Sequence, residues 1–280
     1  MTLARTADLL AAAAAERAAV GAFNVLHLET AEALVAAAER SGLPVILQIS
    51  ENCVSFHGSL EPVARASLAL AHAAAVPVAV HLDHAESEGL ALAAIDLGFT
   101  SVMYDGAKLP FAENVEATRR VVAAAHAARV SVEAELGEIG GKDGAHAPGV
   151  RTDPGEAAQF VADTGVDSLA VAVGSSHAMT ERTASLDLQL IERLAAAVPV
   201  PLVLHGSSGV ADEIIVAGIR AGLVKVNVST HLNASFTGAV RAYLAENPAV
   251  VDSRKYVAAG RAALSAEAER LLRLFAGQSS

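Results

Sequence analysis

Short apolar runs alternate with longer alanine-rich segments along the chain. Eight apolar runs predict β-strands, at 20–25, 44–50, 77–83, 101–106, 130–137, 168–175, 201–208 and 223–230. The alanine-rich segments predict helices with recognisable ends: one stops at Gly42, a typical C-cap, and another starts with Asp153 as N-cap and Pro154 in the first turn. This alternation is typical of repeated βα units around a parallel sheet.

The order and number of these elements favour one closed barrel. Eight βα units without a linker or a shift in composition predict a single (β/α)8 TIM-barrel domain over residues 1–280. An extra N-terminal helix is expected to cover the bottom of the barrel, and a C-terminal helical extension to lie beyond it. A Rossmann-like open sheet is the alternative, but no G-x-G-x-x-G follows a strand and opens a helix.

Composition narrows the class of partner. The 20 Lys and Arg against 31 Asp and Glu give a net charge of −11, which leaves no basic field for nucleic acid. No stretch approaches about 20 uncharged apolar residues, so no membrane span is expected. Cys53 is the single cysteine, so an intrachain disulfide is impossible, a reducing cytoplasm is expected, and any metal site must use histidines or carboxylates.

Histidines stand at the ends of three predicted strands. The active site of a TIM barrel lies at the C-terminal ends of its strands, and His84, His177 and His205 each follow a different one. Three histidines with an open coordination position are typical of catalytic zinc. A lone histidine is more often an ordinary packed or surface residue, and only the joint placement favours the metal site. His81 is expected one layer deeper, as a structural partner.

Carboxylates end the neighbouring strands. Asp83, beside the expected metal, is a candidate general base, with orientation of a histidine as the alternative role. Asp105 and Glu135 are interpreted as groups that orient the histidines or as a second cation position. Glu133 lies two residues before Glu135, therefore deeper, and is expected to be structural.

The last two predicted strands lead into small hydroxylated residues. HGSSG (205–209) and NVST (227–230) lie where TIM barrels commonly bind phosphate with backbone amides, hydroxyls and a helix N-terminus. Plain helix N-caps are the alternative interpretation. A glycine-rich segment, 137–153, follows the fifth strand and is expected to be a mobile loop.

Taken together, these motifs resemble the class II, zinc-dependent ketose-bisphosphate aldolases, a family that includes fructose- and tagatose-bisphosphate aldolases. The resemblance spans almost the whole chain. It rests on AFNV at Ala22, PVILQIS at Pro44, PVAVHLDHAES at Pro77, GFTSVMYDGAKLPFAENVEATRRVV at Gly98, SVEAELGEIGG at Ser131, TDPGEAAQFV at Thr152, SHA at Ser176, PLVLHGSSG at Pro201 and KVNVST at Lys225.

The resemblance implies a reversible retro-aldol cleavage to dihydroxyacetone phosphate and an aldehyde. It implies that His84, His177 and His205 bind zinc, that Asp83 takes the C4 hydroxyl proton, and that Asn227 helps hold the enediolate. It places Asp105 and Glu135 at the family's second cation position. It assigns phosphate, with a Na⁺ or K⁺ ion, to Ala178, Gly206, Ser208, Ser229 and Thr230, and a distal phosphate across a subunit boundary to Arg254 or Arg261.

Three positions depart from the family pattern. Lys142-Asp143 stands where the family carries an acidic loop residue that shuttles a proton; Asp143 or Glu138 is the substitute. Ala178 replaces the usual glycine after a zinc histidine. Glu51, in SENCVSFHG, is positioned to face an unusual substrate.

Other functions remain open at this point. Lys225, the one lysine inside a predicted strand, would suit Schiff-base aldol chemistry. A catalytically silent sugar-phosphate-binding subunit of a partner aldolase, and an aldolase for a different ketose phosphate, are further alternatives. A homodimer or homotetramer is expected, with the C-terminal helix serving assembly.

Overall fold

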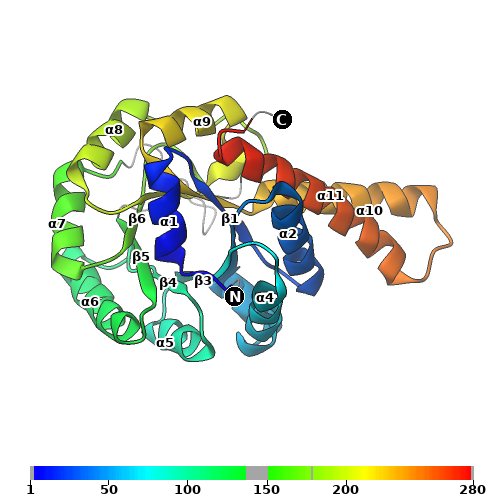
Figure 1. Cartoon of the computed structure of the whole chain (residues 1–280), viewed down its shortest axis with the longest axis horizontal. Helices are drawn as coiled ribbons and strands as arrows, with labels where there is room; N and C mark the ends of the chain where they lie inside the picture. The colour runs from blue at the N-terminus through cyan, green and yellow to red at the C-terminus, as the bar shows by residue number, and fades with distance from the viewer. Residues whose placement is uncertain (1–2, 137–150, 178, 279–280) are drawn as a thin grey trace.

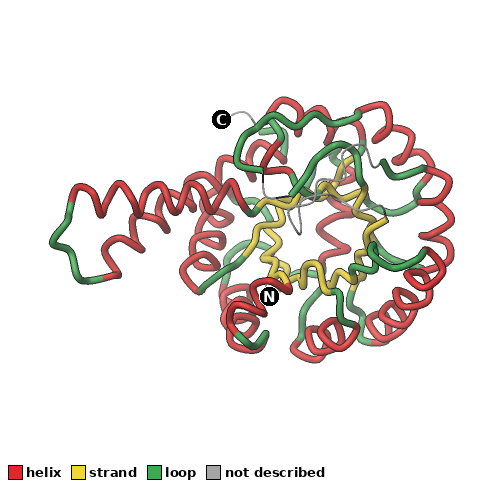
Figure 2. Tube along the Cα trace, turned by 180° about the vertical axis from the view of Figure 1, so that it is seen from behind, coloured by secondary structure: helices red, strands yellow, loops and turns green. Residues whose placement is uncertain are grey.

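The chain forms a closed barrel of eight parallel strands. The computed structural model describes residues 3–136, 151–177 and 179–278. The strands pair in sequence order, with β1 also paired to β8, as Figure 2 shows for the yellow ring. They are β1 Val20–Asn24, β2 Val45–Ser50, β3 Val78–Ala85, β4 Ser101–Tyr104, β5 Ser131–Leu136, β6 Ser168–Val171, β7 Leu202–Leu204 and β8 Leu223–Val228. The predicted TIM barrel is confirmed, and the open-sheet alternative is wrong.

Helices surround this ring (Figure 1). They are α2 Leu28–Ser41, α3 Glu51–His57, α4 Glu61–Ala73, α5 Glu88–Leu97, α6 Phe111–Ala127, α7 Pro154–Thr164, α8 Leu188–Ala197, α9 Asp212–Ala221, α10 Thr230–Glu246 and α11 Ser253–Phe275, with a 3-10 turn, η1, at Ser207–Gly209. The predicted boundary signals hold: Gly42 ends α2 in the left-handed conformation, and the Asp153 side chain accepts hydrogen bonds from the first turn of α7.

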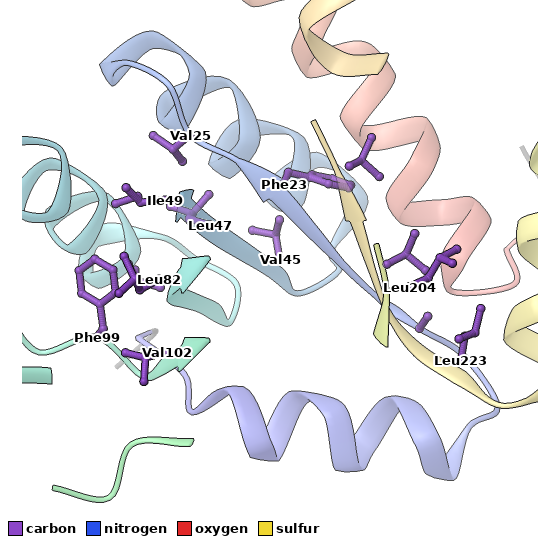
Figure 3. Close-up of a cluster of buried hydrophobic side chains, with 14 of the residues drawn as sticks. Phe23, Val25, Val45, Leu47, Ile49, Leu82, Phe99, Val102, Leu204 and Leu223 are labelled. Carbon is purple, nitrogen blue, oxygen red and sulfur yellow. The ribbon is translucent and has the colours of Figure 1, made fainter. Parts of the chain in front are cut away.

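Apolar side chains fill the space between the strands and the outer helices. Figure 3 shows part of this core, where Phe23, Leu47 and Leu82 from three neighbouring strands pack with residues such as Phe99. All four are at most 2% exposed. Apolar side chains on the outer face of the strands thus pack against the helices, while the side chains on the inner face fill the interior of the barrel.

The N-terminal helix α1, Thr6–Ala15, covers the bottom of the barrel, as expected (Figure 1). Its Leu9 and Leu10 pack with Val20, Ile46 and other strand residues in a second, smaller core. The hydroxyl of Thr6 hydrogen-bonds Ser101 on β4 at 2.7 Å. The opposite end, where the strands finish, is left for the site.

The C-terminal helical extension is also present. Helices α10 and α11 form a hairpin that projects from one side of the barrel, and α11 returns to pack against α2 and β1 (Figure 1). No helix in the described parts of the chain combines the length and apolar character needed to cross a membrane.

Candidate metal centre and active site

Three strands carry paired polar residues into the barrel interior. Side chains two residues apart point to the same face of a strand. Strands β3, β5 and β8 each carry such a pair. The first members form a lower layer of His81, Glu133 and Lys225, and the second members form an upper layer of Asp83, Glu135 and Asn227. Lys225 bonds Glu133 although β8 and β5 are not neighbours, so this contact crosses the interior.

At the level of the upper layer and above it, four side chains from four strands or their ends converge. His84, Glu135, His177 and His205 each offer one donor atom, and the four atoms lie within 4.8 Å of one another. Nε2 of His84 is 3.0 Å from Nδ1 of His205. Imidazole nitrogens with a carboxylate oxygen form a donor set that suits zinc and similar divalent metals, so the residues present fit such an ion.

Carboxylates orient two of the three histidines. Oδ2 of Asp105 lies 2.8 Å from Nδ1 of His84, and Oε1 of Glu133 lies 2.9 Å from Nε2 of His205. A carboxylate that accepts the proton of one ring nitrogen leaves the lone pair of the other nitrogen for a metal. The structure therefore separates Asp105 from Glu135: Asp105 orients a histidine, and Glu135 lies within the donor group.

The backbone at His84 departs from regular strand geometry. Its φ is +50°, and the pairing of β3 with β4 shifts register between Leu82 and Ala85. Consecutive strand residues normally face opposite sides, whereas here Asp83 and His84 both reach the interior. Strain of this kind is concentrated at functional sites.

Asp83 lies beside the donor group. Asp83 is 3% exposed. Its Oδ2 lies 3.5 Å from the side-chain Nδ2 of Asn24, and its Oδ1 lies 3.4 Å from the side-chain Nδ2 of Asn227. Burial opposes ionisation, yet the electrostatic effect of the surrounding His84, His205 and Lys225 side chains holds the pKa of Asp83 below its usual value. The group is therefore a carboxylate, able to accept a proton, at neutral pH.

A cavity of about 500 Å³ opens over Asp83, His84 and His177. One part of it is lined by residues that follow β7 and β8: Gly206, Ser207, Ser208, Ser229 and Thr230. Another part is lined by residues at or after the ends of β2, β3 and β4: Ser50, Glu51, Asn52, Ser55, Glu86 and Lys108. β3 and β7 lie on opposite sides of the eight-stranded ring. The cavity thus connects two chemically different ends.

The end formed by β7 and β8 is suited to an anion. Gly206 adopts φ +66°, and a Cβ there would lie 2.6 Å from the Ser176 backbone, so only glycine allows the two loops to approach. Helix α10 starts at Thr230, and Ser229, its N-cap, makes no side-chain cap bond. The N-terminus of this 17-residue helix, next to three serines and a threonine, is a ready anion site.

Several predicted residues lie elsewhere. Arg254 pairs with Asp252 at the start of α11, and Arg261 pairs with Glu32 on α2; neither lines the cavity. Lys225 lies below the donor group, fully buried and also outside the cavity lining, which does not suit a Schiff-base lysine. Ala178, Glu138, Lys142 and Asp143 are outside the described residues.

Sequence reasoning missed two polar residues at the mouth of the barrel. Gln48 donates from Nε2 to Oδ1 of Asn24 at 2.7 Å, and the Asn24 amide in turn faces Asp83. Both interrupt otherwise apolar strands, β1 and β2, at their C-terminal halves. A polar residue at that place was the available signal.

A parallel barrel with a histidine and carboxylate donor group at the C-terminal ends of its strands defines a metal-dependent TIM-barrel enzyme. Comparison with known proteins specifies the class. The family model described as "Fructose-bisphosphate aldolase class-II" matches residues 4–279. The chain belongs to the class II fructose-bisphosphate aldolase family, whose members are metal-dependent.

Individual relatives agree with this assignment. A fructose-bisphosphate aldolase of Geobacillus stearothermophilus is 43% identical over 270 residues, covering 95% of this chain and 94% of the relative. The crystal structure of the YdjI aldolase of Escherichia coli K12 superposes with a TM-score of 0.83 at 32% identity, covering 98% and 97% of the two chains. Fructose-bisphosphate aldolase of Campylobacter jejuni shares the fold, with a TM-score of 0.81 at 22% identity, covering 98% and 95%.

Proposed function

We propose that this class II aldolase uses zinc to cleave fructose 1,6-bisphosphate or tagatose 1,6-bisphosphate reversibly into dihydroxyacetone phosphate and an aldehyde. The observation that carries the proposal is the presence, around one cavity, of a metal donor group, a buried carboxylate and an anion site. The reaction requires stabilisation of negative charge, removal of a hydroxyl proton and binding of a phosphate, and these three features would supply them in that order.

His84, His177 and His205 are the zinc ligands in this proposal, and Glu135 is a further ligand or part of a second cation position. Three neutral imidazoles are the protein ligands of many catalytic zinc sites. When bound, the metal supplies Lewis-acid stabilisation of the negative charge that develops on the substrate oxygens. Asp105 and Glu133 keep two of the ligands in the required tautomer and orientation.

Asp83 takes the proton of the C4 hydroxyl. As that O–H bond breaks, the C4 carbonyl of the leaving aldehyde forms, the C3–C4 bond breaks, and its electron pair passes to the dihydroxyacetone phosphate half. Asn227 donates a hydrogen bond to the oxygen that gains charge there. Its amide nitrogen is already 3.4 Å from Asp83, so one side chain connects the base with the reacting carbons.

The phosphate of the dihydroxyacetone half binds at Gly206, Ser208, Ser229 and Thr230. Backbone amides, hydroxyls and the α10 dipole supply this interaction without a cationic side chain, which explains how a chain of net charge −11 binds an anion. The family resemblance adds the amide of Ala178 and a Na⁺ or K⁺ ion, and makes Asp143 of the Lys142-Asp143 segment the proton shuttle.

Assembly completes the proposal. Arg254 lies on the projecting α10–α11 hairpin, away from the cavity of its own chain, so it reaches a distal phosphate only across a subunit boundary (Figure 1). This placement favours a homodimer or homotetramer. Cys53 is free and buried, consistent with the cytoplasm as the proposed compartment.

The test measures dihydroxyacetone phosphate released from fructose 1,6-bisphosphate, tagatose 1,6-bisphosphate and fructose 1-phosphate. Each substrate is assayed before chelation, after it, and after zinc is restored. Cleavage that chelation stops and zinc restores is the expected result. Cleavage that ignores the chelator contradicts the metal mechanism, and a zinc-loaded protein that cleaves none of the three contradicts the proposed substrates and favours a different ketose phosphate or a silent subunit.

A further inference from the structure

A buried ammonium group lies beneath the metal centre. Lys225 is 0% exposed, and burying a charged amine is costly unless it is paired and hydrogen-bonded. Its Nζ donates to Oε2 of Glu133 at 2.6 Å and lies 3.3 Å from Nε2 of His81. Lys225 is not among the residues that line the cavity, so its function is not contact with the substrate.

Glu133 connects this lysine to a proposed metal ligand. One carboxylate oxygen, Oε2, accepts from Lys225, and the other, Oε1, lies 2.9 Å from Nε2 of His205. Lys225, Glu133 and His205 are each at most 2% exposed, so water does not compete for these bonds. The position of the ammonium therefore controls the position of the carboxylate that faces the histidine.

A second neighbour competes for the same nitrogen of His205. The amide nitrogen of Asn227 lies 3.0 Å from Nε2. As an N–H donor it requires a lone pair there, whereas the carboxylate of Glu133 requires a proton. A neutral imidazole carries one proton, so the two neighbours favour opposite tautomers. Only the tautomer with its proton on Nε2 leaves the Nδ1 lone pair toward His84 and Glu135.

We propose that Lys225 is a positioning residue that, through Glu133, holds His205 in the tautomer able to bind the metal. The ammonium keeps the Glu133 carboxylate aligned on Nε2 of His205. It therefore favours the tautomer protonated at Nε2 over the one that the Asn227 amide favours. The inference rests on the proposed function in one respect, which is that His205 is a metal ligand.

The lower side of Lys225 is held by a chain of hydrogen bonds to the bottom of the barrel. His81 accepts from Nζ at Nε2, which leaves its Nδ1 proton to donate to the hydroxyl of Ser101 at 2.7 Å. Ser101 in turn hydrogen-bonds Thr6 of α1 at 2.7 Å. Burial and the Lys225 charge lower the pKa of His81 well below its usual value, so His81 is a neutral acceptor. The ammonium is thus fixed from both sides.

Zinc affinity tests the inference in the full-length protein. Lys225→Met, which removes the ammonium and fills its space, is expected to raise the zinc Kd by about 10–100-fold, as measured against a chelating dye. Lys225→Arg keeps the cation and is expected to recover part of the affinity. Thr164→Val removes a buried hydroxyl at the end of α7 that bonds the backbone carbonyl of Phe160 in the same helix, and it controls for lost stability alone. A zinc Kd for Lys225→Met within about twofold of the parent overturns the inference.

The tautomer of His205 is a second readout that needs no metal. Nitrogen-15 NMR of the metal-free protein, with ring signals assigned by comparison with His205→Ala, is expected to show the proton on Nε2 in the parent and partly on Nδ1 in Lys225→Met. An unchanged tautomer overturns the inference even if the parent is an active aldolase. A parent that binds no zinc contradicts the proposed function, while the tautomer shift still supports the positioning role.

If Lys225→Met does not fold, Glu133→Gln provides a second test. Glu133→Gln preserves shape but replaces the carboxylate with a weaker acceptor, and it is expected to shift the tautomer in the same direction. If Glu133→Gln folds and leaves both the zinc Kd and the tautomer at parental values, the inference is wrong.

Discussion

Oδ2 of Asp105 lies 2.8 Å from Nδ1 of His84, and this contact turns Nε2 of His84 toward the other metal donors. Asp105 is 5% exposed and comes directly after β4, one strand away from His84 on β3. The carboxylate is therefore placed to influence a bound metal through the histidine, and under the proposed function it should affect metal affinity without direct coordination.

Asp105→Ala should lower zinc affinity by about 10–100-fold while leaving the histidines in place. The physical reason is that His84 loses the acceptor that fixes its tautomer. The measurement is the zinc Kd by competition with a chelating dye. Asp96→Ala, on the exposed face of α5, is the matched control. Equal zinc Kd values for the two variants would mean that Asp105 does not orient His84.

Asp83→Ala should retain zinc and lose cleavage by about 10²–10⁴-fold, because the proposed base is gone while the group of four metal donors is intact. The measurement combines metal content with the rate of dihydroxyacetone phosphate release. Near-parental turnover in the zinc-loaded variant would remove Asp83 from its role as base.

Gly206→Ala should damage the protein more than the same substitution at another glycine with positive φ, because it disturbs the anion site. At Gly206 the added Cβ meets the Ser176 backbone at 2.6 Å, whereas at Gly42, with φ +70°, nothing lies within 4 Å. Gly42→Ala should therefore lower the unfolding free energy only by the cost of placing an alanine in the left-handed conformation, about 1 kcal/mol. Chemical denaturation and the KM for the phosphorylated substrate check the pair. Equal losses of stability in both variants, together with parental KM values, would contradict this role of Gly206.

Acid should weaken the junction that holds α10 against α11. Glu267 on α11 bonds His231 of α10 and Arg270; burial opposes its ionisation, but these partners lower its pKa to about 2. Because the folded pKa is depressed, the unfolded chain takes up the proton first, and the stabilisation is present above pH 4.5 and lost as the pH falls toward 2.

Glu267→Gln should accordingly lower the unfolding free energy at pH 7 and lose that difference from the parent as the pH falls from 5 toward 2. Glu61→Gln, in an exposed pair with Arg65, should have little effect at any pH. Denaturation midpoints along a pH series provide the test. A difference between parent and Glu267→Gln that stays constant over this range would contradict the depressed pKa.

Much of the fold could be predicted from the sequence because the apolar runs mark the positions of the strands. All eight strands begin within one residue of the runs at 20, 44, 77, 101, 130, 168, 201 and 223. Their ends were harder to place: β7 stops at Leu204 because Gly206 turns into the left-handed region two residues later. The short helix α3 was not predicted, although Ser50 caps it by accepting from Cys53.

The site was predicted in part for a physical reason. Barrel topology alone brings the ends of β3, β6 and β7 to one mouth, so the convergence of the histidines followed from their places in the chain. Strand alternation, by contrast, places Asp83 and His84 on opposite faces, and the irregular φ of His84 that brings both inward leaves no mark in the sequence. The pairing of Lys225 with Glu133 also depends on contacts across the barrel that spacing cannot specify.

The most direct test compares zinc content and cleavage in the parent and in His205→Ala. The account predicts that the parent, loaded with zinc and freed of excess metal, keeps its zinc and releases dihydroxyacetone phosphate, and that His205→Ala loses both because one of the converging donors is missing. Full zinc retention with near-parental cleavage in His205→Ala would contradict the assignment of the metal centre.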